Sequence, residues 1–333
     1  MSGNNPSLVI GSGTLAINSG HWRPPAALIT QPEPASLLDR AVLQQFAHVR
    51  MANSLDESEL RGLETELPTV ATVVGIGGGT AIDAAKYVAW CRGAPLYLAP
   101  SAVSVDACVT NTVAVRAKGK IEYRGFVTAR QVLVDIELIQ AAPARMNRAG
   151  LGDLLSIHTA MWDWQHGASR GGAELDPEAA AQALNILEQI TGIADEIFAV
   201  TPRAVESVIR AYAAVSLLER KLGHAQAEEG SEHYFAYCLE SLAGRSFTHG
   251  EIVTLGTVLM SELQDNHAEH IRNVADKAGV LWRPADLGVS LDQIELTLRQ
   301  LGGFVRDSGL PWSVIDEIPI DDAAFARLRQ VAR

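Results

Sequence analysis

Three side chains that could bind a divalent cation lie far apart in the chain: Asp153, His233 and His249. One carboxylate and two imidazoles are a suitable ligand set for a catalytic metal that keeps a coordination position open for substrate. Gly244 separates the two histidines, so they cannot share one helical face, but two adjacent helix starts could aim both rings at one point. Taken singly, each residue also fits a structural role, and Asp153 fits a helix N-cap or first turn.

A run of glycines offers a second kind of chemistry. It consists of Gly77, Gly78 and Gly79, between a predicted buried strand and a strongly helical stretch. Strand, glycines and helix present bare backbone N–H groups and a positive dipole end to a phosphate. The same residues also fit a tight turn without a ligand, in which Thr80 is the N-cap and Asp83 completes a capping box or pairs with Lys86.

A polar loop follows the next predicted strand, residues 95–99. It carries Ser101, Ser104, Asp106 and Thr110. In a parallel α/β domain this loop lies beside the glycine turn, at the carboxyl end of the sheet where ligands gather. The hydroxyls could bond a cofactor and Asp106 a substrate hydroxyl, although short polar residues in loops often satisfy only local backbone groups.

The elements that must position these residues change character along the chain. The predicted strands are residues 7–10, 26–30, 69–76, 95–99 and 132–135. The predicted helical stretches of the second half are residues 153–167, 176–198, 202–223, 232–242, 250–264 and 291–301. We therefore expect an α/β domain with a parallel sheet over residues 1–150 and an all-helical domain over 151–333. The cleft between two such domains is the default ligand site.

Composition limits the partners. The 333 residues have a formal net charge of −12, which argues against a nucleic-acid surface or an anionic membrane surface. The three cysteines show no CxxC spacing, so they form neither a disulfide framework nor a thiolate zinc site, and they indicate a reducing, cytoplasmic setting. No apolar run approaches the length of a membrane span. A small molecule is the expected partner.

Several motifs together resemble the superfamily of iron-containing alcohol dehydrogenases, glycerol dehydrogenases and dehydroquinate synthases. Within it the chain most resembles the branch of the sn-glycerol-1-phosphate dehydrogenases, and the resemblance covers about residues 70–260. The segments that carry it are residues 77–86 (GGGTAIDAAK), 100–106 (PSAVSVD), 132–135 (VLVD), 142–145 (APAR), 150–156 (GLGDLLS), 163–164 (DW), 230–233 (GSEH) and 249–251 (HGE).

The resemblance implies a Rossmann-like nucleotide domain followed by a helical metal-binding domain. The cofactor-binding residues that it implies are Gly77, Gly78, Gly79, Thr80, Asp83, Ser101, Ser104 and Thr110. It implies that Asp153, His233 and His249 hold a divalent metal and that Asp106 contacts substrate hydroxyls. Iron enzymes of the superfamily usually add a histidine at the position of Ile157, so its absence favours a three-ligand, zinc-like site. Dehydroquinate synthases carry glutamate in place of Asp153.

The chain departs from the branch at two positions. Val105 stands where the branch usually has histidine, and Tyr237 stands where it has a second histidine that contacts the substrate. A tyrosine can bond an alcohol or a phosphate, but it is neutral and longer. The resemblance therefore implies the metal and cofactor residues but does not identify the exact substrate. Tyr237 is a candidate catalytic residue, together with Asp106 and Asp153.

We expect a metal-dependent NAD(P) oxidoreductase, a homo-oligomer, that interconverts glycerol phosphate or another small polyol and its ketone. The alternatives are a cyclase or lyase of the dehydroquinate synthase type and a non-catalytic nucleotide-binding relic. Residues 28–33 carry neither a clear ribose-binding acid nor a phosphate-binding arginine, so NAD and NADP both stay open. The basic stretch 116–130, with Lys118 and Lys120, fits either a solvated hairpin or a phosphate-binding segment.

Overall fold

The chain forms two compact units in the computed structural model, which describes residues 6–117 and 120–331. One unit extends to Asn147 and also includes Thr201–Ile209; the other consists of Arg148–Val200 and the residues from Arg210 onward. The division expected at residue 150 differs in that residues 201–209 group with the first unit. Helices α7 (Ala144–Leu155) and α11 (Pro202–Leu222) therefore each contain residues of both units.

The first unit is built on a six-stranded sheet in the order β1-β8-β5-β4-β2-β3, and all its strand pairs are parallel. The strands are β1 (Ser7–Gly11), β2 (Ala26–Thr30), β3 (His48–Met51), β4 (Thr72–Gly77), β5 (Leu96–Pro100) and β8 (Gln131–Asp135). The predicted parallel α/β fold is confirmed. Strand β3 was not predicted, because this four-residue edge strand has two polar side chains and its hydrophobic pattern is too short to stand out.

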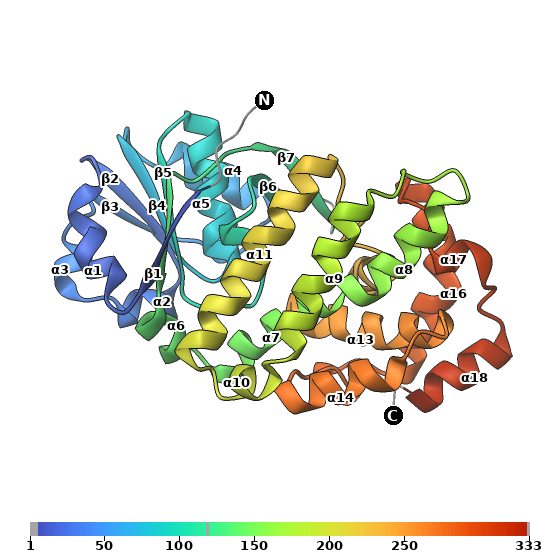
Figure 1. Cartoon of the computed structure of the whole chain (residues 1–333). Coiled ribbons are helices and arrows are strands. Elements are labelled where there is room, and N and C mark those ends of the chain that lie inside the picture. The colour runs from blue at the N-terminus through green and yellow to red at the C-terminus, as the bar shows by residue number, and fades with distance from the viewer. Residues whose placement is uncertain (1–5, 118–119, 332–333) are drawn as a thin grey trace. The chain divides into compact units, whose positions relative to one another are not determined.

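Helices cover this sheet, as Figure 1 shows. They are α1 (Thr14–Asn18), α2 (Pro32–Leu37), α3 (Arg40–Leu43), α4 (Glu57–Thr65), α5 (Gly79–Arg92) and α6 (Ile136–Ala141), with short 3-10 turns at Ser19–His21 (η1) and Asp106–Cys108 (η2). Helix α5 lies very close to β4. A Cβ atom on Gly75 would stand 2.6 Å from the Cβ of Ala85, and one on Gly77 would stand 2.7 Å from the Cβ of Ala81. These two glycines are required for helix–strand packing, whatever the turn binds.

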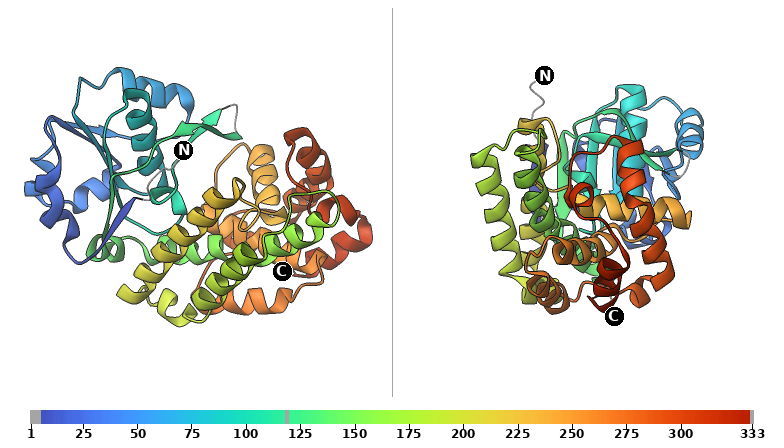
Figure 2. Two further views of the ribbon diagram at one scale, coloured as in Figure 1. Left: turned by 45° about the horizontal axis from the view of Figure 1, so that its top comes forward. Right: turned by 90° about the vertical axis from the view of Figure 1, so that its right-hand side faces the viewer.

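The basic stretch forms an antiparallel hairpin of β6 (Thr112–Ala117) and β7 (Lys120–Phe126), a separate two-stranded sheet (Figure 2). Arg124 of the hairpin forms an ion pair of 2.7 Å with Glu57 of α4 and another of 2.7 Å with Glu122. The positive charge of Arg124 is therefore balanced by carboxylates of the same unit. Lys118 lies outside the described residues.

The second unit is helical, as expected (Figure 1). Besides its parts of α7 and α11 it contains α8 (Ile157–Ala168), α9 (Pro177–Thr191), α10 (Ala194–Phe198), α12 (Ser231–Ala243), α13 (His249–Leu263), α14 (Ala268–Ala278), α15 (Pro284–Leu287), α16 (Leu291–Ser308), α17 (Val314–Glu317) and α18 (Asp322–Val331). Its main core lies around α13, on which Leu255, Leu259 and Met260 are fully buried. No helix in the described ranges is long and apolar enough to cross a membrane.

The start expected for the helix at Asp153 is wrong. Helix α7 begins at Ala144, after Pro143, and Asp153 lies in its last turn. The glycines at 150 and 152 lie inside this helix. Gly152 is there because another helix backbone passes against it: a Cβ atom on Gly152 would overlap the carbonyl oxygen of Gly250 on α13.

Close helix packing brings three helices of the second unit together. A Cβ atom on Gly250 would overlap the carbonyl oxygen of Ala149 on α7. One on Gly256 would stand 2.5 Å from the carbonyl oxygen of Glu232 on α12. Since no side chain separates these backbones, α7, α12 and α13 approach closely enough for short side chains from all three to meet.

Candidate metal and cofactor sites

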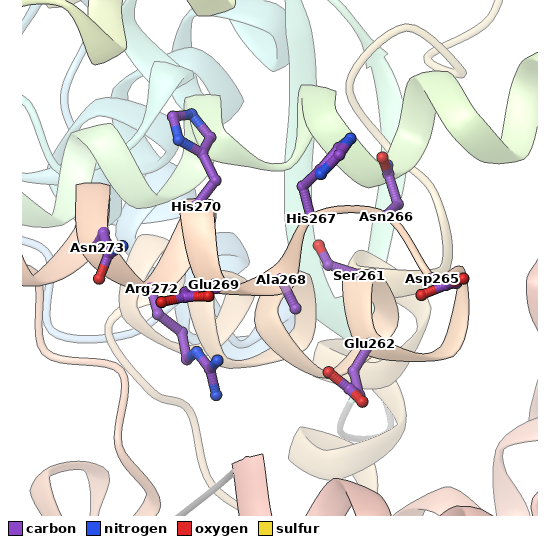
Figure 3. Close-up of a pocket in the computed structure, with 10 residues that line it drawn as sticks. All are labelled: Ser261, Glu262, Asp265, Asn266, His267, Ala268, Glu269, His270, Arg272 and Asn273. Carbon is purple, nitrogen blue, oxygen red and sulfur yellow. The ribbon is translucent and has the colours of Figure 1, made fainter.

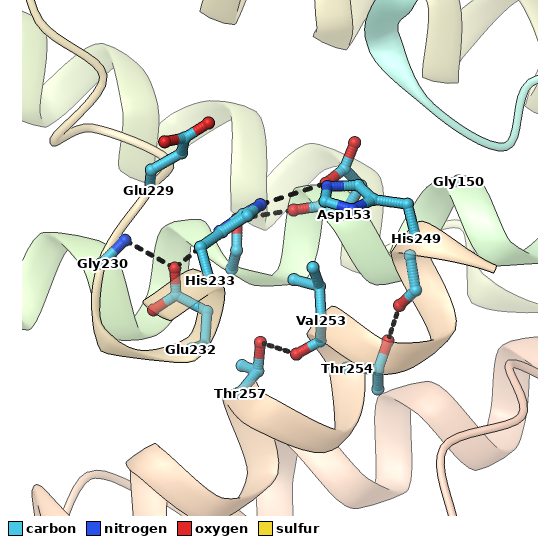
Figure 4. Close-up of polar contacts among 12 residues, drawn as sticks. Gly150, Asp153, Glu229, Gly230, Glu232, His233, His249, Val253, Thr254 and Thr257 are labelled. Atoms are coloured by element: carbon cyan, nitrogen blue, oxygen red, sulfur yellow. Dashed lines mark hydrogen bonds and ion pairs between the residues drawn. The ribbon is translucent and has the colours of Figure 1, made fainter. Parts of the chain in front are cut away.

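The three expected metal ligands converge in the second unit. Asp153 comes from the last turn of α7, His233 from the first turn of α12, and His249 is the first residue of α13 (Figure 4). The Oδ1 atom of Asp153 lies 3.5 Å from Nε2 of His233 and 3.2 Å from Nε2 of His249. Among the described residues, this is the group of His, Cys, Asp and Glu side chains whose ligand atoms all lie within 4.8 Å of one another.

The three side chains of the cluster strongly influence one another's pKa. Asp153 and His233 are buried, and the side chain of His249 is 32% exposed. Burial alone would raise the pKa of Asp153, but the two histidines outweigh it and hold that pKa below its ordinary value. Burial alone would lower the pKa of each histidine, but the Asp153 carboxylate raises both, that of His233 strongly. Protons on the histidines or a bound cation must therefore balance the negative charge of Asp153.

Glu232 orients the imidazole of His233, and sequence analysis did not single it out. Its Oε1 atom lies 2.8 Å from Nδ1 of His233 and accepts a hydrogen bond of 2.6 Å from the backbone N–H of Gly230 (Figure 4). Its Oε2 atom accepts one of 2.7 Å from the hydroxyl of Thr159. With Nδ1 bonded to a carboxylate, Nε2 is left for the cluster, which is the usual arrangement of a metal-binding histidine.

The residues present fit a divalent cation. Two imidazole Nε2 atoms and one carboxylate oxygen face one another, and the orienting carboxylate of Glu232 sets the tautomer of His233. Ile157, at the position where iron enzymes of the superfamily add a ligand, is fully buried at the start of α8. The donor set of two nitrogens and one oxygen thus suits zinc, as expected from the sequence.

Tyr237 lies one helical turn after His233 on α12, with the two ring centroids 5.8 Å apart. Its hydroxyl donates a hydrogen bond of 3.2 Å to Oε1 of Glu229. Glu229 acts electrostatically on His233 as well. The candidate Tyr237 is therefore adjacent to the cluster and is held by a carboxylate that the sequence alone did not point to.

The predicted cofactor segments lie side by side at the carboxyl end of β4 and β5. Gly77 and Pro100 are register partners, and the backbone N–H of Ser101 donates to the carbonyl of Gly77 at 2.9 Å. The backbone N–H of Gly78 donates to Oε1 of Gln31 at 3.0 Å. The glycine turn is thus anchored by its neighbouring strand and by a side chain that follows β2.

The expected capping box is wrong. The N-cap of α5 is Gly78, which has no side chain, and Thr80 lies inside the helix. Asp83 is buried and forms an ion pair of 2.8 Å with Lys86, the partner that sequence analysis kept as an alternative. Burial raises the pKa of Asp83, and Lys86 opposes that rise. The carboxylate of Asp83 is therefore paired with Lys86 inside the unit.

Lys86 connects this pair to the polar loop. Its Nζ atom donates to the carbonyl of Ala107 at 3.0 Å and to the hydroxyl of Thr110 at 3.2 Å. Ala107 belongs to the 3-10 turn that begins at Asp106, whose side chain is partly buried. Ser101 and Ser104 are buried beside it. Asp106 and the cofactor segments all lie in the first unit, whereas the metal cluster lies in the second.

The other histidines have separate environments. His267 and His270 are exposed and line an open polar groove at the start of α14 (Figure 3). His158 bonds the carbonyl of Asn266 at 2.7 Å, and His166 bonds that of Trp162 at 2.8 Å. None of the predicted site residues lines the groove.

Comparisons with known proteins agree on one group. A family model described as iron-containing alcohol dehydrogenase matches residues 28–143. The glycerol-1-phosphate dehydrogenase (NAD(P)+) of Hyperthermus butylicus is 28% identical over 291 residues, which cover 85% of this chain and 83% of the relative. The enzyme of the same name from Pyrobaculum arsenaticum is 30% identical over 254 residues, 74% of each chain.

Solved structures agree with the fold. A probable glycerol dehydrogenase from Sinorhizobium meliloti 1021 is similar with a TM-score of 0.75 and 23% identity, over 99% of this chain and 97% of the other. The sulfoacetaldehyde reductase of Bifidobacterium kashiwanohense, solved in complex with NAD+, is similar with a TM-score of 0.71 and 15% identity, over 99% and 98% of the two chains. At such identities these likenesses establish the architecture alone.

Proposed function

The chain belongs to the glycerol-1-phosphate dehydrogenase-like branch of the iron-containing alcohol dehydrogenase superfamily, and from this premise we propose that it is a metal-dependent NAD(P) oxidoreductase that interconverts glycerol-1-phosphate, or a closely related small polyol, and its ketone. The observation that carries the proposal is the convergence of Asp153, His233 and His249, each from a different helix. Because the relatives named above are dehydrogenases, the cyclase alternative is not favoured.

Each metal-site residue has a distinct task in the proposal. Asp153, His233 and His249 hold the metal, which when bound supplies Lewis-acid polarisation of a hydroxyl or carbonyl oxygen. Glu232 keeps Nε2 of His233 directed at the cluster through its 2.8 Å contact with Nδ1. Tyr237 presents a hydroxyl, held by Glu229, that can bond a substrate oxygen next to the metal.

The first unit binds the nucleotide in this proposal. The backbone amides of Gly79 and Thr80, at the start of α5, receive the pyrophosphate, while Gln31 holds the amide of Gly78, and the cofactor supplies the hydride acceptor or donor. Ser101, Ser104 and Thr110 contact the cofactor from the adjacent loop. Asp106 orients a substrate hydroxyl and aids removal of its proton.

The substrate side of the proposal is a small polyol or its phosphate, without nucleic acid. We further propose a homo-oligomer that works in the cytoplasm. The three cysteines support a reducing setting, since Cys91, Cys108 and Cys238 are all free thiols.

A substrate and cofactor panel tests the proposal. Purified protein loaded with zinc is given glycerol, glycerol-1-phosphate, glycerol-3-phosphate or dihydroxyacetone phosphate with each nicotinamide cofactor, and the absorbance of the reduced nicotinamide is followed. We expect turnover of at least one substrate, and its loss in His249→Ala. Zinc-loaded protein that turns over none of the four contradicts the proposed substrate class.

The hairpin of β6 and β7 is either a solvated hairpin or a source of phosphate-binding charge, and exchange of its lysines distinguishes the two. Exchange of Lys118 and Lys120 for alanine is expected to raise the KM for a phosphorylated substrate while the KM for glycerol stays unchanged. An unchanged KM for the phosphorylated substrate removes the hairpin from the site.

A further inference from the structure

Asp163 on α8 is a buried carboxylate that the proposed reaction does not use. It is 3% exposed, and its oxygens accept three hydrogen bonds from three other elements. Oδ2 accepts from the backbone N–H of Ser231 at 2.8 Å; Oδ1 accepts from the backbone N–H of Val314 at 2.8 Å and from Nε2 of Gln264 at 3.1 Å. Ser231 and Val314 are the first residues of α12 and α17, and Gln264 is the C-cap of α13.

The start of α12 depends on residues outside its own N-cap. That N-cap is Gly230, which has no side chain, so the first N–H groups of the helix need other acceptors. Asp163 supplies one from α8, and a carboxylate at a helix N-terminus is also favoured by the helix dipole. The contact is close: a Cβ atom on Gly230 would stand 2.8 Å from Oδ2 of Asp163 and 2.8 Å from Cα of Ala160.

The two residues that follow directly are a proposed metal ligand and the carboxylate that orients it. Glu232 comes next after Ser231, and His233 after it. Helix α8 holds Glu232 as well, because the hydroxyl of Thr159 donates to its Oε2 at 2.7 Å. Two contacts from one helix thus determine where the first turn of α12 lies. Because metal–ligand distances tolerate deviations of only about 0.2 Å, a displaced first turn weakens the site.

We propose that Asp163 is a positioning residue of the metal site: by accepting the amide of Ser231 it fixes the start of α12 and so holds Glu232 and His233 in place before the metal binds. This proposal rests on the assignment of Asp153, His233 and His249 as metal ligands. Through Val314 the same carboxylate ties α17 to the site. Burial and the nearby Glu232 raise the pKa of Asp163 to about 7, so this position carries an electrostatic cost that a purely apolar residue would avoid.

The test is the zinc affinity of metal-free protein, measured at about pH 8, above the pKa of Asp163, by competition with a chromogenic chelator. Asp163→Asn keeps the size of the side chain and one acceptor oxygen, but its NH2 group cannot accept a backbone N–H. We expect the zinc Kd to rise about 10-fold, as for other residues that support metal ligands. A folded variant whose zinc Kd stays within about twofold of the wild type overturns the proposal.

Asp276→Asn is the matched control. Asp276 is also a hydrogen-bonded carboxylate of the second unit, but it lies on α14 and accepts from Nε1 of Trp282 and from Arg283. Its exchange is expected to lower thermal stability and leave the zinc Kd unchanged. A similar rise of the zinc Kd in both variants would indicate general loosening, which contradicts a specific role of Asp163.

Hydrogen exchange of the wild-type protein gives a second test that does not depend on a folded variant. We expect the amides at the start of α12 to exchange slowly even without zinc, because Asp163 already holds them. Rapid exchange that becomes slow only on addition of zinc overturns the proposal. A wild-type protein that binds no zinc refutes the metal site itself, which is a different outcome from zinc binding that Asp163→Asn leaves intact.

Discussion

Glu232 lies against His233, with its Oε1 atom 2.8 Å from Nδ1 of the imidazole. The carboxylate is fully buried and is bonded on its other side by the hydroxyl of Thr159. A charged acceptor on Nδ1 raises the basicity of the ring and directs Nε2 to the proposed metal position. The residue next to the proposed ligand in the sequence is therefore also its orienting partner in space.

Glu232→Gln tests this relationship. The amide keeps the shape and the acceptor oxygen for His233 and Gly230, while its NH2 group can donate to the hydroxyl of Thr159, so mainly the charge is lost. We expect zinc affinity to fall about 10-fold or more. Glu262→Gln, which alters an ion pair of α13 with Arg327, serves as control and is expected to bind zinc normally. Equal zinc affinity of both variants would contradict the orienting role.

Gly250→Ala tests the close approach of α7 and α13. The new Cβ atom would overlap the carbonyl oxygen of Ala149, so the helices must separate. We expect a loss of about 1–3 kcal/mol in the free energy of unfolding, measured with denaturant, together with weaker zinc binding.

Gly303→Ala is the matched control for this exchange. Gly303 lies inside α16, where an added Cβ atom meets nothing within 4 Å. Alanine there is expected to increase stability by about 0.5–1 kcal/mol through its higher helix propensity. If Gly250→Ala is equally well tolerated, the glycine contact does not limit how close the helices lie.

Lys86→Met tests the buried pair beneath the polar loop. It leaves Asp83 buried without its cation and removes the donors to Ala107 and Thr110. Breaking such a pair on one side costs about 3–5 kcal/mol of stability. We expect the free energy of unfolding, measured with denaturant, to fall by that amount. We also expect the KM for the nicotinamide cofactor to increase, because the polar loop loses the hydrogen bonds from Lys86.

The double variant Asp83→Asn with Lys86→Met removes both charges at once. It is expected to recover most of the stability lost in Lys86→Met, but not the cofactor KM. Recovery of both properties would mean that the loop does not depend on the ammonium group.

The raised pKa of Asp163 makes the free energy of unfolding of the protein depend on pH. Burial, followed by repulsion from Glu232, raises its pKa from 3.8 to about 7. The folded state then binds more protons than the unfolded state between these values. The stabilisation that comes from this raised pKa, measured as free energy of unfolding, is therefore fully present below about pH 4. It is lost as the pH rises through about 7.

The stability of metal-free wild type relative to Asp163→Asn is expected to fall by several kcal/mol over that range, because a tenfold change in proton affinity corresponds to about 1.4 kcal/mol. Denaturant unfolding of both proteins at a series of pH values measures the difference. A difference that does not change with pH refutes the raised pKa.

Local patterns in the sequence were enough for much of the fold and of the candidate site. The alternation of apolar strands with helices predicts the parallel sheet, because residue type and short spacing translate directly into elements. Asp153, His233 and His249 are candidates by residue type, and the family resemblance, not their spacing, joins them into one metal site. The glycine turn and the polar loop were found from local pattern.

Only the tertiary structure decided which groups support these residues. The roles of Glu232 and Asp163 depend on contacts between helices that are distant in the chain, and no spacing rule encodes such contacts. Asp153 lies in the last turn of α7 instead of at a helix start, and the adjacent Gly152 lies inside the helix because the backbone of α13 approaches it closely. Residue types thus determined the chemistry available to the protein, and long-range packing determined its arrangement.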